Sequence, residues 1–135
     1  MLINEQLSPS LVPNPLSVLP SLSTEEVVQL MRVDKSFGTP RILNALKDAY
    51  DVINRQLIPA AFDYAHTHAF IRAYRRAVLH ETAALLSDLY ADFDTLGQGG
   101  IRADGLSLKS DSLRRIVSHA VADLNGRPRN RICLL

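Results

Sequence analysis

Apolar residues recur at helical spacing through the middle of the chain and predict a long helix over residues 66–93. The segment has no Gly or Pro and would be about 40 Å long at 1.5 Å per residue. A second face carries Phe70, Ala73, Ala77 and Ala84, which either pack against a neighbouring chain or are only good helix formers. The main stripe lies within about 60° of one line and consists of Ile71, Tyr74, Val78, Leu85, Leu86, Leu89 and Phe93.

Two shorter helices are predicted before it. Ser23 begins the first as the N-cap of a capping box, and Gly38 is suited to the turn after it. Thr39 as N-cap and Pro40 in the first helical position begin the second helix, which ends just before Pro59. Its buried stripe is predicted to be Ile42, Leu46, Ala49, Tyr50, Ile53 and Leu57.

Residues 92–110 contain four glycines and are predicted to form a loop, either mobile or ordered by a partner. The last helix is predicted from Asp111 to Asn125, with Gly126 as its C-cap. Its stripe would be Leu113, Ile116, Val117, Ala120 and Leu124. The fold class is therefore all-α, a small antiparallel bundle of about four helices with an extended arm at each end.

The two arms are predicted from the composition of the chain ends. Residues 1–22 hold four of the seven prolines among apolar residues, so they are either mobile or extended along a partner. In residues 127–135, three arginines alternate with other residues before an apolar end, which is either disordered or an arm that pairs with a partner by its backbone. The predicted division is arm 1–22, helical domain 23–126 and arm 127–135.

Composition excludes several classes of protein. The 135 residues are 47% apolar and 21% charged, as in one ordinary globular domain. No run of 18 apolar residues predicts a membrane span. Cys133 is the single cysteine, which excludes an internal disulfide and favours a reducing compartment.

No pattern of residues supports catalysis or metal binding. His66 and His68 would point to nearly opposite sides of a helix. The segment 92–103 begins like a calcium loop, but Leu96 stands where an oxygen ligand is needed. Neither a phosphate-binding loop nor a nucleophile with its base is found, so no enzyme activity and no cofactor are predicted.

Arginine is the main basic residue, and its positions allow a second interpretation. Arg72, Arg75 and Arg76 cluster on one flank of the long helix, where they either bind phosphates or pair with carboxylates. With Arg114, Arg115 and the C-terminal tail they would form the basic surface of a helical nucleic-acid-binding protein. The net charge of only +1 and the apolar end of the tail argue against that alternative.

Three segments resemble the head-completion proteins of contractile-tailed temperate phages. They are MRVDKSFGTPRILNALKDAY (31–50), FIRAYRRAVLHETAALLSDLYADFD (70–94) and RPRNRI (127–132). Their order, their spacing and the total length are similar to that family over about residues 25–135. The connection before the long helix is shorter, and the proline-rich N-terminus has no counterpart.

The resemblance implies a structural, non-enzymatic virion protein, made in the bacterial host cytoplasm and located at the head–tail neck. Such head–tail connectors assemble as a ring under the portal with its twelve-fold symmetry, and they retain packaged DNA without sequence-specific contacts. The expected partners are the portal protein, neighbouring copies, packaged DNA in the lumen and the next neck or tail-terminator protein, with no membrane.

The resemblance and the residue patterns together give three groups of candidate site residues. The portal-binding arm would comprise Arg127, Pro128, Arg129, Arg131, Ile132 and Leu134. The ring interface would comprise Phe70, Arg72, Ala73, Arg76 and Ala77. The loop facing the lumen or the docked component would comprise Gly97, Gln98, Gly99, Gly100 and Arg102.

Overall fold

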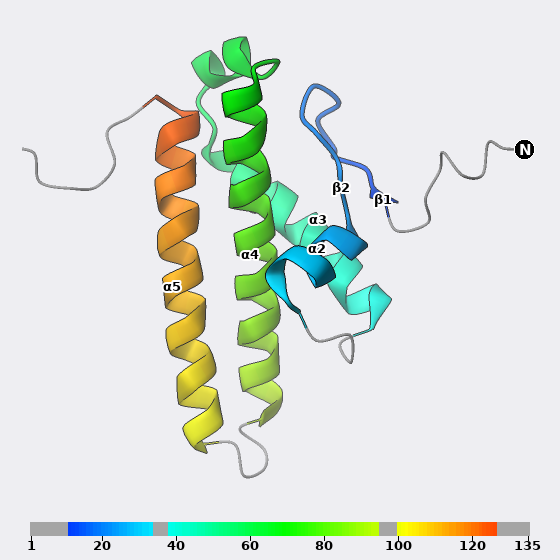
Figure 1. Ribbon diagram of the computed structural model, residues 1–135, viewed down its shortest axis with the longest axis vertical. Helices are drawn as coiled ribbons and strands as arrows, with labels where there is room; N and C mark the ends of the chain where they lie inside the picture. Colours follow the sequence, from blue (N-terminus) through cyan, green and yellow to red (C-terminus); the bar gives the residue numbers. More distant parts are fainter. Residues whose placement is uncertain (1–10, 34–37, 95–99, 127–135) are drawn as a thin grey trace, which may run out of the picture.

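The computed structural model describes residues 11–33, 38–94 and 100–126, and this part of the chain is mainly helical, which confirms the all-α prediction. Helices α4 and α5 lie side by side as a long antiparallel pair, and α3 crosses α4 (Figure 1). The elements in chain order are β1 (Leu11–Val12), β2 (Leu22–Ser23), α2 (Thr24–Met31), α3 (Thr39–Gln56), the 3-10 helix η2 (Pro59–Tyr64), α4 (His68–Asp94) and α5 (Gly100–Leu124).

The capping box predicted for the first helix is present at the start of α2. The Ser23 Oγ accepts a hydrogen bond from the Glu26 amide at 3.2 Å, and the Glu26 Oε2 accepts one from the Ser23 amide at 2.9 Å. The end of α2 differs from the prediction, because the left-handed residue is Arg32 (φ 53°). Gly38 (φ 84°) instead precedes α3, so Thr39 is its first helical residue and not its N-cap.

The apolar period correctly predicted which side of α3 is buried. All six residues of its predicted stripe are buried. In α4 the main stripe is also turned inward, with Tyr74, Val78 and Leu86 buried and Ile71, Leu85 and Leu89 partly buried. The side chain of Phe93 lies outside the described part of the structure.

The alanine face of α4 packs against α5 of the same chain. Glu81 and Asp88 lie on the same side of α4 as Ala73, Ala77 and Ala84, and both bond to Arg114 of α5. Small side chains let the two helix backbones approach closely, and all three alanines are at most 9% exposed. Ala73, Ala77 and Ala84 are therefore covered within the chain, a third possibility beside the two that the sequence left open.

The prediction of a loop over residues 92–110 was wrong for most of its length. Helix α4 continues to Asp94 and α5 begins at Gly100, so only residues 95–99 separate them, and they lie outside the described residues. Glycine disfavours a helix by about 1 kcal/mol per residue relative to alanine. Helix α5 forms through these residues despite this preference, as helices paired with another element commonly do.

The prediction of an extended arm over residues 1–22 does not hold for residues 11–22. This segment folds back as a small hairpin whose strands pair Leu11 with Ser23 and Val12 with Leu22. Val12, Leu19 and Leu22 are at most 4% exposed and belong to the core. Their apolar character, taken as a sign of contact with another protein, reflects burial within the chain.

Buried polar groups fix this hairpin to α3 and α4. The Asn14 Nδ2 donates to the Tyr74 hydroxyl at 2.7 Å, and that hydroxyl donates to the Asn54 Oδ1 at 2.6 Å. The Asn54 Nδ2 donates back to the Asn14 Oδ1 at 3.2 Å, which closes a ring of three hydrogen bonds. The Tyr50 hydroxyl donates to the Val12 carbonyl oxygen at 2.7 Å and accepts from the Leu22 amide.

Candidate functional site

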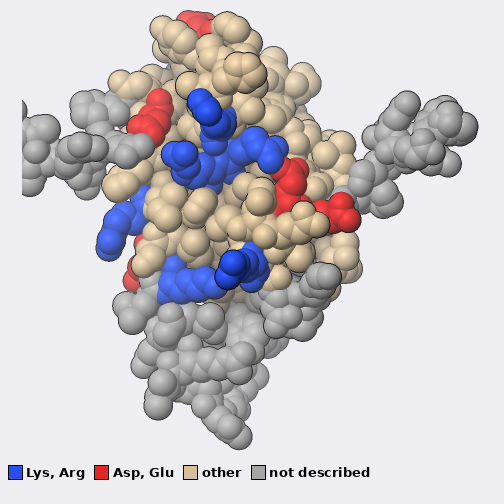
Figure 2. All heavy atoms as spheres, viewed as in Figure 1, with Lys and Arg blue, Asp and Glu red and all other residues tan. Residues whose placement is uncertain are grey.

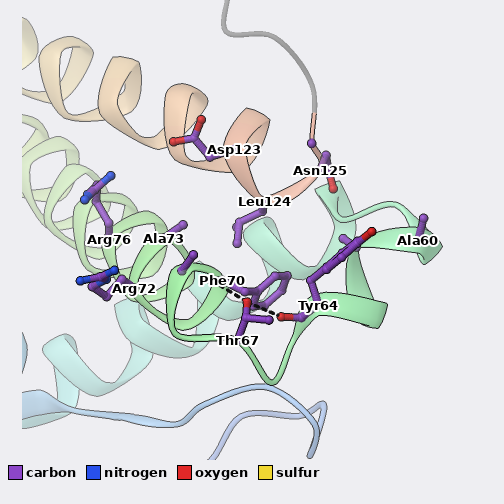
Figure 3. Close-up of a pocket in the computed structure, with 13 residues that line it drawn as sticks. Ala60, Tyr64, Thr67, Phe70, Arg72, Ala73, Arg76, Asp123, Leu124 and Asn125 are labelled. Atoms are coloured by element: carbon purple, nitrogen blue, oxygen red, sulfur yellow. Dashed lines mark hydrogen bonds between the residues drawn. The ribbon is translucent and has the colours of Figure 1, made fainter.

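A pocket opens where η2, the first turns of α4 and the end of α5 meet (Figure 3). Its volume is about 620 Å³, within the range of cavities that hold a ligand or a partner's side chains. The end of α5 is far from η2 and the start of α4 in the sequence, so it must be held beside them for the pocket to exist.

Asn125 holds the end of α5 against the segment between α3 and η2. The Asn125 Oδ1 accepts a hydrogen bond from the Ile58 amide at 3.0 Å, and its Nδ2 donates to the Gln56 carbonyl oxygen at 2.9 Å. Gly126 then has φ 68°, a left-handed conformation that favours glycine, as predicted for the C-cap. This end of α5 is thereby fixed beside η2.

Thr67 holds the start of α4 against η2. Its Oγ1 accepts from the Phe70 amide at 3.2 Å, as an N-cap side chain does, and donates to the Tyr64 carbonyl oxygen at 2.8 Å (Figure 3). The sequence prediction began this helix at His66 and missed Thr67, although threonine before a long apolar period is a recognised N-cap signal.

The pocket has an apolar floor and a polar rim. Phe70, Ala73 and Leu124 form the floor and are between 4% and 9% exposed. The Phe70 ring stacks on Tyr74 with centroids 6.3 Å apart, which fixes its position. On the rim, Tyr64 is 63% exposed and stands beside the cavity (Figure 3).

Arg72 and Arg76 give the rim its charge. Both are exposed side chains of α4 that line the pocket, with Asp123 of α5 on the opposite wall (Figure 3). Neither arginine forms an ion pair with a carboxylate of the described residues. Basic side chains gather over the face of the molecule where α4 lies (Figure 2).

Two other arginines of the predicted basic set have partners within the fold. Arg75 pairs with Glu26 of α2. Arg114 of α5 donates to the Asp88 Oδ2 at 2.8 Å and reaches the Glu81 Oε2 at 3.4 Å. Burial lowers the pKa of Arg114, but its bonds to Asp88 and Glu81 outweigh this and raise the pKa. These two guanidinium groups therefore bind α2 and α5 to α4.

The composition of the pocket suits contact with another protein. Tyrosine and arginine are enriched among the residues that dominate binding energy at protein interfaces, and an apolar floor supplies area to bury. Among residues 11–33, 38–94 and 100–126, no group of three or more His, Cys, Asp or Glu is placed to hold a metal ion. In the same ranges, no helix has the length and apolar character needed to cross a membrane.

The three groups of candidate residues differ in where they lie and in whether the structure describes them. Of the ring-interface candidates, Phe70, Arg72, Ala73 and Arg76 meet at the pocket, whereas Ala77 is fully buried against α5 and so cannot contact a neighbour. Residues 97–99 lie outside the described part, and Gly100 and Arg102 fall in the first turn of α5. The six arm candidates between 127 and 134 also lie outside it, directly after Gly126 of the pocket.

Comparison with known proteins identifies a family. The family model for phage head completion protein (GPL) matches residues 63–135, just over half of the chain. The matched region includes all of α4 and α5, and with them most of the pocket. No curated protein and no solved structure matches the chain.

Proposed function

The chain belongs to the phage head completion protein (GPL) family, and we propose that it acts as a head–tail connector that assembles as a ring under the portal. Membership gives a structural role in the virion, in a family not known for enzymatic activity. In the proposed role, about twelve copies retain the packaged DNA and provide the surface on which the next neck or tail component docks.

The main observation behind this proposal is the family match to residues 63–135, which covers both the helix pair and the C-terminal segment. The pocket supports it physically, because its exposed Tyr64, Arg72 and Arg76 surround an apolar floor, as at protein interfaces. Each subunit of a ring needs only a modest interface, since joined subunits bind a symmetric partner with avidity.

Residues 127–135 are the proposed portal-binding arm. In an extended chain Arg127, Arg129 and Arg131 would face one way, and Ile132 and Leu134 the other. Backbone pairing with a portal strand would supply affinity, the apolar side chains would anchor the arm and the arginines would fix its register. The described chain ends at Gly126, at one end of the helix pair (Figure 1).

The end of α4 and the start of α5 lie at the opposite end of the pair (Figure 1). If the arm binds the portal, these two helix ends lie far from the portal contact along a helix pair about 40 Å long. We therefore assign Gly97, Gln98, Gly99, Gly100 and Arg102 to the lumen or to the docking surface of the ring. The nucleic-acid-binding alternative is weakened, because Arg75 and Arg114 pair within the fold.

Deletion of residues 127–135 tests the proposal. We expect the variant to keep its helicity and thermal midpoint, because Asn125 and Gly126 still end α5. We expect its apparent affinity for portals to fall at least about tenfold, through lost avidity, and filled heads to lose DNA. The measurements are circular dichroism, co-sedimentation with portals and DNA content of heads.

A matched control replaces residues 127–135 with a Gly/Ser segment of equal length, which keeps the chain length but removes the arginines and apolar anchors. This variant should behave like the deletion. Portal binding that stays at the wild-type level in both variants would contradict the assignment of the arm. Completed heads that contain no copy of the wild-type chain would contradict the whole proposal.

A further inference from the structure

We propose that the pocket between η2, α4 and α5 receives the hairpin tip of a second copy of this chain. The tip consists of residues 15–18, and the contact joins neighbours head to tail. This inference rests on the proposed ring and names the surfaces that would form it. It follows from two features of the described residues, one concave and one convex, that match in polarity.

The convex feature is an apolar tip exposed to solvent. Leu16 is 39% exposed and Val18 is 64% exposed, although the same hairpin places Val12, Leu19 and Leu22 in the core. Leu16 and Val18 thus place apolar surface at the tip of the hairpin, where a partner can reach it. Most of the Val18 side chain is left uncovered by the described residues of the same chain.

Hydrogen bonds make the tip rigid before any contact. The Asn14 amide donates to the Ser21 Oγ at 2.9 Å, and the Asn14 Nδ2 donates to the Pro20 carbonyl oxygen at 2.9 Å. The Leu16 amide donates to the Asn14 Oδ1 at 3.0 Å, and the Leu19 amide to the Leu16 carbonyl oxygen at 3.0 Å. Little conformational entropy is therefore lost when the tip docks.

The tip cannot enter the pocket of its own chain. Asn14 holds the hairpin to Asn54 of α3 and to Tyr74 on the side of α4 that faces α3. The pocket is instead lined by η2, the start of α4 and the end of α5, and α5 lies on the other side of α4 from the hairpin (Figure 1). Only the tip of another copy can reach it, and the two surfaces then lie on different parts of each chain.

The charges beside the tip are balanced. Asp51 and Arg55 of α3 both line a shallow hollow with Pro15 and Leu16, so a carboxylate and a guanidinium stand beside the tip. Arg55 donates its Nε to the Asp51 carbonyl oxygen at 3.1 Å, and no ion pair to the Asp51 carboxylate is found in the described part of the chain. Arg72 and Arg76 lie at the rim of the pocket, where a carboxylate would fix the orientation of the docked copy.

A contact between two different surfaces is heterologous. It leaves one free tip and one free pocket on every pair, so further copies add until the rotation closes a ring. The charged C-terminal segment is a poorer occupant, because Arg127, Arg129 and Arg131 would approach Arg72 and Arg76. The tip is apolar, and Asp51 and Arg55 beside it add no net charge.

Cross-linking between copies tests the inference in the full-length chain with Cys133→Ser. One batch carries Val18→Cys, a second, size-tagged batch carries Ala69→Cys at the pocket, and the mixture is treated with a short bismaleimide. Ser118→Cys, an exposed position of α5 outside the pocket, replaces Ala69→Cys in the control. We expect the Val18–Ala69 product to form at least about tenfold faster than the control product, because docking holds the thiols at millimolar effective concentration.

The same pairs are tested in filled heads completed with each mixture. Equal rates for the two pairs, both in solution and in heads, would overturn the inference and leave the pocket to another occupant, such as the C-terminal segment or a different virion protein. The proposed function would still stand if the chain were found in those heads. Its absence from them would instead contradict the proposed function.

A complementary mixture tests the head-to-tail arrangement. The pair Leu16→Ser with Val18→Ser removes the apolar tip without adding a charge, and the pair Arg72→Glu with Arg76→Glu alters the pocket. Neither variant alone should self-associate, whereas a mixture retains one intact tip facing one intact pocket and should form dimers but no larger species. Native mass spectrometry measures this, and larger assemblies of either variant alone would contradict the arrangement.

Discussion

At the scale of single residues, two phenol groups link the N-terminal hairpin to the helices. Tyr50 and Tyr74 are fully buried, and their hydroxyls bond to groups of residues 12–22 and to Asn54. Burial raises the pKa of both phenols, most strongly that of Tyr74, although the hydrogen bond from Asn14 lowers it in part. Their neutral form is therefore part of the folded structure.

Alkaline pH should accordingly destabilise the fold. The unfolded chain ionises its tyrosines near pH 10, and the folded pKa values of Tyr50 and Tyr74 are higher, so folding opposes ionisation. Stability from these groups is complete below about pH 10 and is lost as pH rises through the folded values. Urea unfolding followed by circular dichroism between about pH 8 and about pH 11 measures the decrease.

Two variants separate this effect from a general response to high pH. Tyr74→Phe lacks the hydroxyl, so its free energy of unfolding should be about 1–2 kcal/mol lower at neutral pH. Above about pH 10 its stability should decrease less than that of the wild type, because it has no phenol to ionise at this position. Tyr64→Phe changes an exposed phenol and should follow the wild-type curve. Identical pH slopes for Tyr74→Phe and the wild type would show that Tyr74 is not responsible.

At the scale of elements, periodicity predicted the helices well where one side is apolar and the caps are local. All six predicted positions of α3 are buried, and the box at Ser23 and the C-cap at Gly126 are as expected. These features depend on neighbouring residues only. The start of α5 at Gly100 was missed, because the four glycines of residues 92–110 are typical of a loop.

The pocket was only partly predictable from sequence. Phe70, Arg72, Ala73 and Arg76 were chosen from one helix and do lie together. Tyr64 and Leu124 could not be added, because they come from other elements: Thr67 fixes η2 against α4, and Asn125 fixes the end of α5 beside residues 56 and 58. A contact between elements so distant in the chain leaves no periodic signal.

The charged contact between α4 and α5 gives the prediction at this scale. Glu81 has a side chain only 6% exposed and relies on Arg114, which also binds Asp88. Arg114→Met should lower the free energy of unfolding by about 1–3 kcal/mol, less than for a fully buried pair because Arg114 is 38% exposed. Urea denaturation followed by circular dichroism measures it.

The neutral replacement of the buried acid is the control for this contact. Glu81→Gln combined with Arg114→Met should be more stable than Arg114→Met alone, since no unpaired charge is then buried. A double-mutant cycle gives the coupling energy between the two positions. Additive effects of the two substitutions would show that Glu81 does not depend on Arg114.

At the scale of the whole molecule, the hairpin of residues 11–22 decides where the folded unit begins. An arm that ends at residue 22 could be removed without loss, but Val12, Leu19 and Leu22 are core residues, and Asn14 completes the polar contacts of Tyr74 and Asn54. Full burial of one such apolar side chain contributes about 1.5–3 kcal/mol. Chain entropy regained on deletion offsets part of this.

Deletion of residues 1–22 should therefore lower the free energy of unfolding by about 3–5 kcal/mol, a large fraction of the 5–15 kcal/mol typical of a domain. Deletion of residues 1–10 leaves every described contact in place and should change it by less than about 0.5 kcal/mol. Urea midpoints of the two truncated chains provide the comparison. Equal midpoints would show that the folded domain begins after residue 22 and that the hairpin adds nothing to its stability. The expected difference would instead show that the base of the hairpin belongs to the core. Only residues 15–18 would then be free to contact another chain.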